Sequence, residues 1–263
     1  MIQVADIDWV LFDLDGTLYE GNQLLPGVID LIRALHRSGK AIRFVSNTSI
    51  FTRRQCALKL NRMGVSARIE EVMTSSYAAA IFASRWLQNP KLWVVGERAL
   101  IDELAVHGIT IAQHASEATH VLVGLDRLFT FEKLTDAMHV LQQGAPLIIT
   151  NPDAFFITET GTVPDTLGLA LAIKTAGNAK HTIVIGKPAD FFFRIIEAEN
   201  GSLLEPNRCL MVGDRLDTDI VFGKKIGMKT VLALTGVSTV TDCSIQSVFP
   251  DYIVHDLREL VVL

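Results

Sequence analysis

The pattern of apolar and polar positions divides the chain into alternating strands and helices. "WVLF" (9–12) is a short apolar run that ends at polar residues, which indicates a buried strand of a parallel sheet. "PGVIDLIRALHRSGK" (26–40) has apolar residues at helical spacing between a proline and a glycine, the usual start and stop signals of a helix. "AIRFVSN" (41–47) predicts the next strand, and "TRRQCALKLNRMG" (52–64) predicts the next helix. Repeated strand–helix units of this kind predict an α/β fold with a parallel sheet.

The same alternation continues to the end of the chain. Strands are predicted at 91–96, 120–124, 146–150, 182–186, 208–214 and 229–234, with a short edge strand at 251–254. Helices are predicted at 97–108, 130–144, 166–176, 188–201 and 217–227. These are more units than one sheet of this type needs. We therefore expect two domains, one of them inserted in the other.

Composition and charge narrow the class of protein. The chain has 263 residues, of which 49% are hydrophobic and 20% charged, an ordinary globular composition. A net charge of −5 and the lack of a dense Lys/Arg run argue against nucleic acid as a partner. No apolar run approaches about 18 residues, so we expect no membrane-spanning helix. The first residues lack the basic segment of a secretory signal, and three cysteines without a C-x-x-C pair favour a reducing compartment. We therefore expect a cytoplasmic protein.

Chemically active side chains gather where the predicted strands end. They are Asp13 and Asp15 after the first strand, Ser46 and Asn47 after the second, Lys187 after "TIVIG", and Asp214 after "RCLMVG", with Asp217 and Asp219 just beyond. In an open parallel sheet, ligands bind outside the carboxyl ends of the strands. We therefore expect these residues to converge on one edge, although they are far apart in the sequence. For Asp217 we prefer a plain role as a charge at a helix N-terminus.

This set of side chains suits phosphoryl transfer. Neighbouring carboxylates raise one another's pKa unless a cation lies between them, and oxygen ligands favour a hard ion such as Mg²⁺. Lys187 is a point charge suited to a phosphoryl oxygen. A carboxylate can also act as a covalent nucleophile and form an aspartyl-phosphate.

Four motifs resemble those of the haloacid dehalogenase superfamily, in the same order. "DLDGTLY" resembles motif I (D-x-D-G-T), "FVSN" is similar to motif II, "GKP" resembles the motif III lysine, and "VGDRLDTDI" resembles motif IV. The large insertion between motifs II and III resembles a C2-type cap. With "LLPGVIDLI", "VSNTS" and "TNPD", the chain is similar to the NagD-like and p-nitrophenyl phosphatase group. One departure is Thr48, where the group often has asparagine.

The resemblance implies catalytic roles for two aspartates. Asp13 would attack phosphorus in line and carry the phosphoryl group. Asp15 would protonate the leaving oxygen and later deprotonate the hydrolytic water. Gly16 would let the chain turn tightly beside the phosphate. The implied reaction is hydrolysis of a small phosphorylated metabolite such as a sugar phosphate, a nucleotide or p-nitrophenyl phosphate.

The resemblance also implies the residues that bind phosphate and metal. Ser46, Asn47 and Lys187 would hold the phosphoryl group, Ser46 by its hydroxyl and Asn47 by its backbone N–H. Mg²⁺ would bind Asp13, the backbone carbonyl of Asp15, and Asp214. Asp219 would lie behind them and hold a metal-bound water or Lys187. Asn151 and Asp153 would either face the substrate from the cap or be plain turn residues around Pro152.

The implied architecture is a doubly wound, Rossmann-like core formed by residues 1–80 and 182–263, with an α/β cap at 81–181. The cap would close over the substrate and set specificity, and a homodimer would fit the family. Two other readings stay open: a phosphomutase, which returns the phosphoryl group to the substrate, and a phosphate-ligand-binding protein without turnover. A dehalogenase is disfavoured, because carbon–halogen displacement needs neither Asp15 nor a metal. The sequence leaves the identity of the phosphomonoester open.

Overall fold

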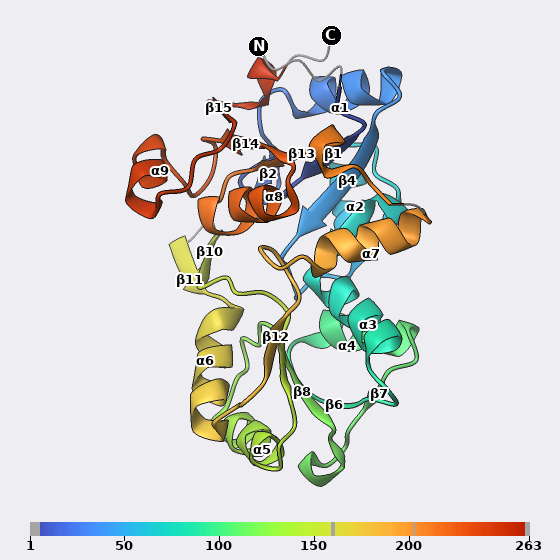
Figure 1. Cartoon of the computed structure of the whole chain (residues 1–263), viewed down its shortest axis with the longest axis vertical. Coiled ribbons are helices and arrows are strands. Elements are labelled where there is room, and N and C mark those ends of the chain that lie inside the picture. Colours follow the sequence, from blue (N-terminus) through green and yellow to red (C-terminus); the bar gives the residue numbers. More distant parts are fainter. Residues whose placement is uncertain (1–5, 159–160, 202, 261–263) are drawn as a thin grey trace. The chain divides into compact units, whose positions relative to one another are not determined.

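A computed structural model describes residues 6–158, 161–201 and 203–260, and the chain divides into two compact units. The first unit comprises Met1–Ser46, Arg54–Met73 and Ile196–Leu263, and the second comprises Asn47–Arg53 and Thr74–Ile195. Each unit contains its own sheet of mainly parallel strands covered by helices (Figure 1). The predicted α/β class is confirmed.

The first unit is built on a six-stranded sheet among the residues described. In the order β15-β14-β13-β1-β4-β5, its strands are Tyr252–Val254, Lys229–Ala233, Cys209–Gly213, Trp9–Phe12, Ala41–Ser46 and Val72–Thr74. β1 lies between β13 and β4, parallel to both, with Trp9 opposite Cys209 and Ala41. The residues that follow β1 and β13 therefore leave the same edge side by side.

Helices and a small hairpin complete this unit. Its helices are α1 (Val28–Arg37), α2 (Arg53–Arg62), α8 (Val221–Ile226) and α9 (Val240–Gln246), while α7 (Phe191–Asn200) spans the division between the units. The hairpin consists of β2 (Tyr19–Glu20) and β3 (Gln23–Leu24), and short 3₁₀ turns lie at Ile69–Glu71, Pro206–Arg208 and Leu257–Glu259. The predicted amphipathic helix at 26–40 is confirmed as α1, whose apolar face, Val28, Leu31, Ile32 and Leu35, joins the core. The edge position of β15 also agrees with prediction.

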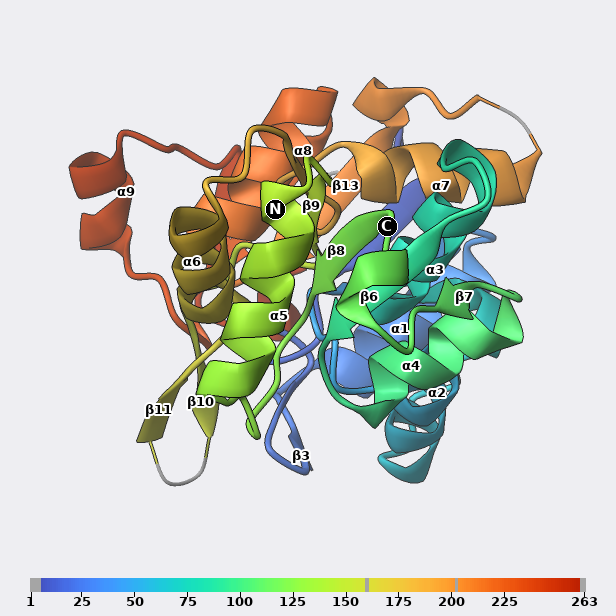
Figure 2. The ribbon, with the colours of Figure 1, turned by 90° about the horizontal axis from the view of Figure 1, so that it is seen from below.

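The second unit has a five-stranded sheet within the described ranges. In the order β12-β9-β8-β6-β7, its strands are Thr182–Val184, Leu147–Ile149, His120–Val123, Lys91–Val95 and Thr110–Ile111. Its helices are α3 (Ser75–Trp86), α4 (Arg98–Val106), α5 (Phe131–Gln142) and α6 (Thr166–Gly177), with a 3₁₀ turn at Ala115–Glu117. α5 and α6 lie on one side of this sheet and α3 and α4 on the other (Figure 2). A hairpin of β10 (Phe155–Thr158) and β11 (Gly161–Pro164) precedes α6.

One predicted strand belongs to a different sheet than expected. The sequence predicts the "TIVIG" strand in the core sheet, but β12 pairs in parallel with β9, with Thr182 opposite Leu147 and Val184 opposite Ile149. Its apolar character suits either sheet equally, so hydrophobicity alone gave no information about its partner. The assignment of this strand to the core is therefore wrong. The domain boundaries near residues 80 and 182 stay a prediction.

Helix α3 was not predicted because it has no polar stripe. All its residues from Ser75 to Ala83 are buried, so the usual contrast between an apolar and a polar face is missing. Within residues 6–158, 161–201 and 203–260, no helix is both long enough and apolar enough to cross a membrane.

Candidate active site

The carboxyl edge of the six-stranded sheet brings acidic side chains together. Asp13 follows β1, and its backbone N–H donates a 2.9 Å hydrogen bond to the carbonyl of Val212 on β13. Asp214 follows β13 directly. Among the described residues, Asp13, Asp214 and Asp219 offer carboxylate oxygens that all lie within 4.8 Å of one another. We call these three residues the acidic cluster. Carboxylates this close favour a bound cation, because each disfavours ionisation of the others.

Asp214 sits in a cradle made partly by glycines. The backbone N–H of Val237 donates to Asp214 Oδ2 at 2.7 Å, and Thr17 Oγ1 lies 3.4 Å from Oδ1. A Cβ added at Gly16 would lie 2.6 Å from Asp214 Oδ2, and one added at Gly236 would lie closer still. Gly16 also has φ +80°, a conformation that favours glycine, in agreement with the predicted tight turn. Gly236 and Val237 were not predicted, although the glycine in "LTGVS" just after β14 was the available signal.

Asp219 belongs to the acidic cluster itself rather than lying behind it. It occupies a π-helical turn, Leu216–Ile220, in which the N–H of Ile220 donates to the carbonyl of Arg215. The N–H of Arg215 in turn donates to Asp219 Oδ2 at 3.1 Å. Turns of this kind are frequent at functional sites. Asp217 points elsewhere: its carboxylate forms a 2.9 Å ion pair with Arg215.

Asp15 lies outside the acidic cluster and has its own partners in the first unit. Tyr19 Oη donates to Asp15 Oδ2 at 3.1 Å, and Lys59 Nζ lies 4.0 Å from Oδ1. Tyr19 is 2% exposed. Burial, together with the negative charges of Asp15 and Asp13, holds the pKa of the Tyr19 phenol well above its ordinary value, so it stays protonated as a donor. No sequence pattern points to Tyr19 or Lys59, because a single tyrosine or lysine carries no motif.

The motif II residues fall on either side of the division between the units. Ser46 ends β4 and is buried, while Asn47 begins the second unit. The Asn47 side-chain amide donates to Asp153 Oδ2 at 2.8 Å and to the backbone carbonyl of Lys187 at 2.9 Å. The amide thus joins three chain segments within the second unit. Thr48, the departure from the family pattern, accepts a 3.1 Å hydrogen bond at its backbone carbonyl from Ser75.

Asn151 and Asp153 form a buried hydrogen-bond network. Asn151 Nδ2 donates to Asp153 Oδ2 at 2.8 Å, and Asn151 Oδ1 accepts from Thr150 and Thr166. Asp153 Oδ2 therefore accepts from both Asn47 and Asn151. The two residues are more than plain turn residues, since they connect the segment after β9 with the start of α6. A contact between either residue and a substrate stays a prediction.

Comparison with known proteins now identifies the family. The model of haloacid dehalogenase-like hydrolases matches residues 10–110, and a second, HAD-hydrolase-like model matches residues 184–260. The sugar-phosphatase AraL of Bacillus subtilis (strain 168) is 34% identical over 255 residues, covering 97% of this chain and 92% of the relative. The chain belongs to the haloacid dehalogenase superfamily.

Solved structures place the chain within one branch of the superfamily. The p-nitrophenyl phosphatase from Archaeoglobus fulgidus aligns with a TM-score of 0.90 and 32% identity, covering 96% of this chain and 97% of that one. NagD from E. coli K-12 aligns with a TM-score of 0.87 and 30% identity, covering 98% and 99%. This haloacid dehalogenase superfamily member therefore lies in the NagD and p-nitrophenyl phosphatase branch, as the motifs predicted. The acidic cluster is consistent with the metal site of the superfamily.

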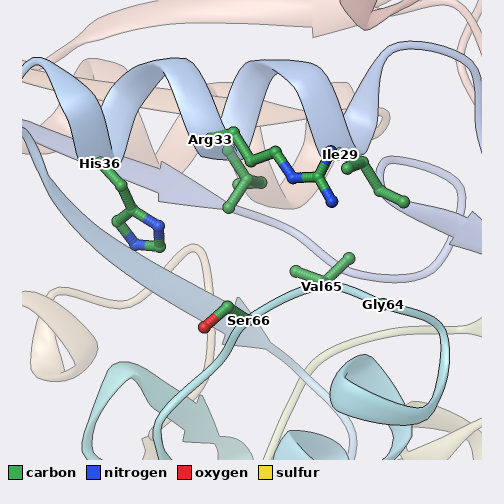
Figure 3. A pocket seen from close by; sticks show the side chains of 7 residues that line it. Ile29, Arg33, His36, Gly64, Val65 and Ser66 are labelled. Carbon is green, nitrogen blue, oxygen red and sulfur yellow. The ribbon is translucent and has the colours of Figure 1, made fainter.

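A separate cavity in the first unit contains none of these residues. It has a volume of about 140 Å³ and lies between α1 and the loop around Val65, where Arg33, His36 and Ser66 contribute its polar groups. Arg33 extends toward Ile29, whereas the His36 ring lies farther along the helix (Figure 3). The two basic groups do not converge on one point, so the cavity lacks the geometry of an anion site.

Proposed function

We propose that this haloacid dehalogenase superfamily member hydrolyses small phosphomonoesters with Mg²⁺, through an aspartyl-phosphate on Asp13. Its activity class is that of its branch, a phosphatase acting on phosphoric monoesters. The observation that carries the proposal is the acidic cluster, whose three carboxylates approach within 4.8 Å at the carboxyl edge of a parallel sheet. Sugar phosphates and p-nitrophenyl phosphate are the substrates that the relatives' names suggest.

The donor set of the acidic cluster suits Mg²⁺. All three side chains offer oxygen, the donor that Mg²⁺ prefers, and few protein ligands leave room for waters and a substrate phosphate. We assign Asp13, Asp214 and the backbone carbonyl of Asp15 as ligands, with Asp219 beside them. When bound, the ion would offset the charge of the carboxylates and of the transferring phosphoryl group.

The chain's own side chains would carry out two displacements. In the first, a carboxylate oxygen of Asp13 forms a bond to phosphorus while the ester P–O bond breaks, and Asp15 gives its proton to the leaving oxygen. In the second, Asp15 takes a proton from water, the water oxygen bonds to phosphorus, and the bond to Asp13 breaks. Inorganic phosphate leaves, and both carboxyl groups return to their starting states.

The remaining roles position the phosphoryl group. Ser46 and the backbone N–H of Asn47 would bind its oxygens, and Lys187 would orient Asp13 and offset charge. The bond from the Asn47 amide to the Lys187 carbonyl supports a joint role for these two residues. We assign residues 81–181 to the cap and residues 1–80 and 182–263 to the core, except for β12 (Thr182–Val184), which pairs with β9 of the five-stranded sheet.

Location and assembly complete the proposal. All three cysteines, Cys56, Cys209 and Cys243, are buried thiols outside any disulfide, which suits a cytoplasmic enzyme. Burial raises the pKa of the Cys209 thiol to about 12, so we assign it no nucleophilic role. A homodimer remains our expectation for the assembled enzyme.

The test is phosphate release from p-nitrophenyl phosphate and from a panel of phosphorylated metabolites, with Mg²⁺ and with EDTA. We expect Asp13→Asn to lower kcat by at least about 10³-fold, since no nucleophile remains. Asp217→Asn is the matched control: it lies near the cluster but pairs with Arg215, and its activity should persist. A folded, Mg²⁺-loaded chain that releases phosphate from no ester would overturn hydrolysis. Isomerised sugar phosphates would then favour a mutase, and binding without turnover would favour a ligand-binding protein.

A further inference from the structure

The Asp15 carboxyl group has two neighbours that the proposed mechanism does not use. Tyr19, on strand β2, donates through its hydroxyl to Asp15 Oδ2 at 3.1 Å. Lys59, on helix α2, places Nζ 4.0 Å from Asp15 Oδ1. All three residues belong to the first unit. Each oxygen of the carboxyl group thus faces a group that can fix its orientation.

The Tyr19 phenol is itself held in place from several sides. The residue is 2% exposed and belongs to the hydrophobic core of the first unit. Its backbone carbonyl accepts from the N–H of Gly16 at 2.9 Å, which closes the loop between Asp15 and Tyr19. Lys59 Nζ lies 3.7 Å from the centroid of the phenol ring, a distance typical of a cation–π contact. These contacts hold the Tyr19 hydroxyl in one position relative to Asp15.

The Asp15 side chain is more exposed to solvent than that of its tyrosine partner. Its side chain is 65% exposed, and holding an exposed side chain in one rotamer costs conformational entropy. An acid–base residue must keep its orientation while it is protonated and while it is ionised. A phenol suits both states, because its hydroxyl can donate to a carboxylate and accept from a carboxylic acid.

We propose that Tyr19, supported by Lys59, is a positioning residue that holds the Asp15 carboxyl group toward the leaving oxygen throughout the reaction. This inference rests on the proposed acid–base function of Asp15. A misoriented acid matters most when the leaving group needs a proton. An alkyl phosphate releases a strongly basic alkoxide, whereas p-nitrophenolate leaves without protonation.

The first test compares two substrates by kcat/KM, which covers the steps up to departure of the leaving group. We expect Tyr19→Phe to lower kcat/KM by about 10-fold for the best alkyl phosphate of the panel, but by less than about 3-fold for p-nitrophenyl phosphate. Lys59→Met should act in the same direction with a smaller effect, and it keeps the test decisive if Tyr19→Phe folds poorly. Tyr252→Phe is the matched control, because Tyr252 lies on the edge strand β15, three places from β1.

The second test is a double-mutant cycle. If Tyr19 acts through Asp15, Tyr19→Phe should cost nothing further in the Asp15→Asn background. Equal losses for both substrates, or an undiminished loss in that background, would overturn the inference while the wild-type chain still hydrolyses esters. A wild-type chain that hydrolyses no ester would instead overturn the proposed function, and this inference with it.

Discussion

The two units share an architecture but differ in how their carboxylates are arranged. In the first unit, Asp13, Asp214 and Asp219 gather within 4.8 Å of one another. In the second unit, Glu103, Asp126 and Asp153 are buried, and each accepts a hydrogen bond from a donor within that unit. Among the described residues, none of these three belongs to the acidic cluster.

The donors in the second unit explain this difference. Glu103 accepts from the backbone N–H of Arg53 at 2.7 Å, and Asp126 accepts from Lys133 Nζ at 2.6 Å. Asp153 accepts from the Asn47 and Asn151 amides. Buried polar groups satisfied in this way stabilise a fold without needing a ligand. Burial of a carboxylate is therefore no sign of a site by itself, whereas the convergence of several carboxylates is.

Within this comparison, the largest effect is expected from crowding the acidic cluster. Gly236→Ala would push a methyl group into Asp214, whose Oδ2 accepts from the neighbouring Val237 N–H. We expect Asp214 to be displaced, kcat to fall at least about 100-fold and the Mg²⁺ requirement to rise. Steady-state rates across a Mg²⁺ titration measure both effects.

Gly168→Ala provides the control for this substitution. An added Cβ at Gly168 meets nothing within 4 Å, and the residue lies in α6. Activity should be unchanged, and stability should rise by about 0.5–1 kcal/mol, because alanine favours a helix. Unchanged activity and metal requirement in Gly236→Ala would mean that the cradle around Asp214 is not needed.

The second prediction concerns the hydrogen-bond network around Asp153 in the second unit. Asp153→Ala removes the acceptor shared by the half-buried Asn47 amide and the buried Asn151 amide, and each amide loses a hydrogen-bond partner. We expect the free energy of unfolding, measured by urea titration, to fall by about 2–3 kcal/mol. Asp102→Ala is the matched control, since its ion pair with Arg98 is exposed and should be worth less than about 0.5 kcal/mol. Equal losses in the two variants would contradict the structural role of the network.

The sequence predicts the carboxylates of the candidate active site better than it predicts the residues that hold them in position. Asp13 and Asp214 follow apolar strands within recognisable motifs, and strand order then brings them to one edge. The family resemblance implies a place for Asp219 behind the cluster, whereas its carboxylate lies within it, on a π-helical turn that the sequence does not distinguish from an ordinary helix start. Tyr19 and Lys59 are brought to Asp15 by folding of a hairpin and a helix, a contact that no local pattern encodes.

The sequence places the "TIVIG" strand in the wrong sheet for a related physical reason. A strand's hydrophobicity reports that it is buried, while its partner is chosen by the connections on either side. β12 follows α6, which packs against β9, and β12 then pairs with that same strand. Local sequence carries little information about these connections. It therefore predicts that a strand is present more readily than it predicts which sheet the strand joins.

The smallest expected effect concerns Glu103, a buried carboxylate for which the hydrogen bond and charge of Arg53 do not fully offset the cost of burial. Burial raises the pKa of Glu103, although the Arg53 N–H and its positive charge act in the opposite direction. The folded state then binds this proton more tightly than the unfolded state, so stability falls as pH rises through the raised pKa. Glu103→Gln keeps an acceptor for Arg53 and removes the charge. We expect it to stabilise the chain by up to about 1 kcal/mol above that pKa.

This gain should shrink as pH falls through the raised pKa, and it should vanish below the ordinary value of 4.5. Urea unfolding of both proteins across pH 4–8 measures the difference. Glu117→Gln, an exposed substitution in the same unit, should give a difference that does not vary in this way. If Glu103→Gln instead destabilised the chain at every pH, its carboxylate would be fully compensated by Arg53. Glu103 would then be an individually satisfied carboxylate whose burial does not destabilise the fold.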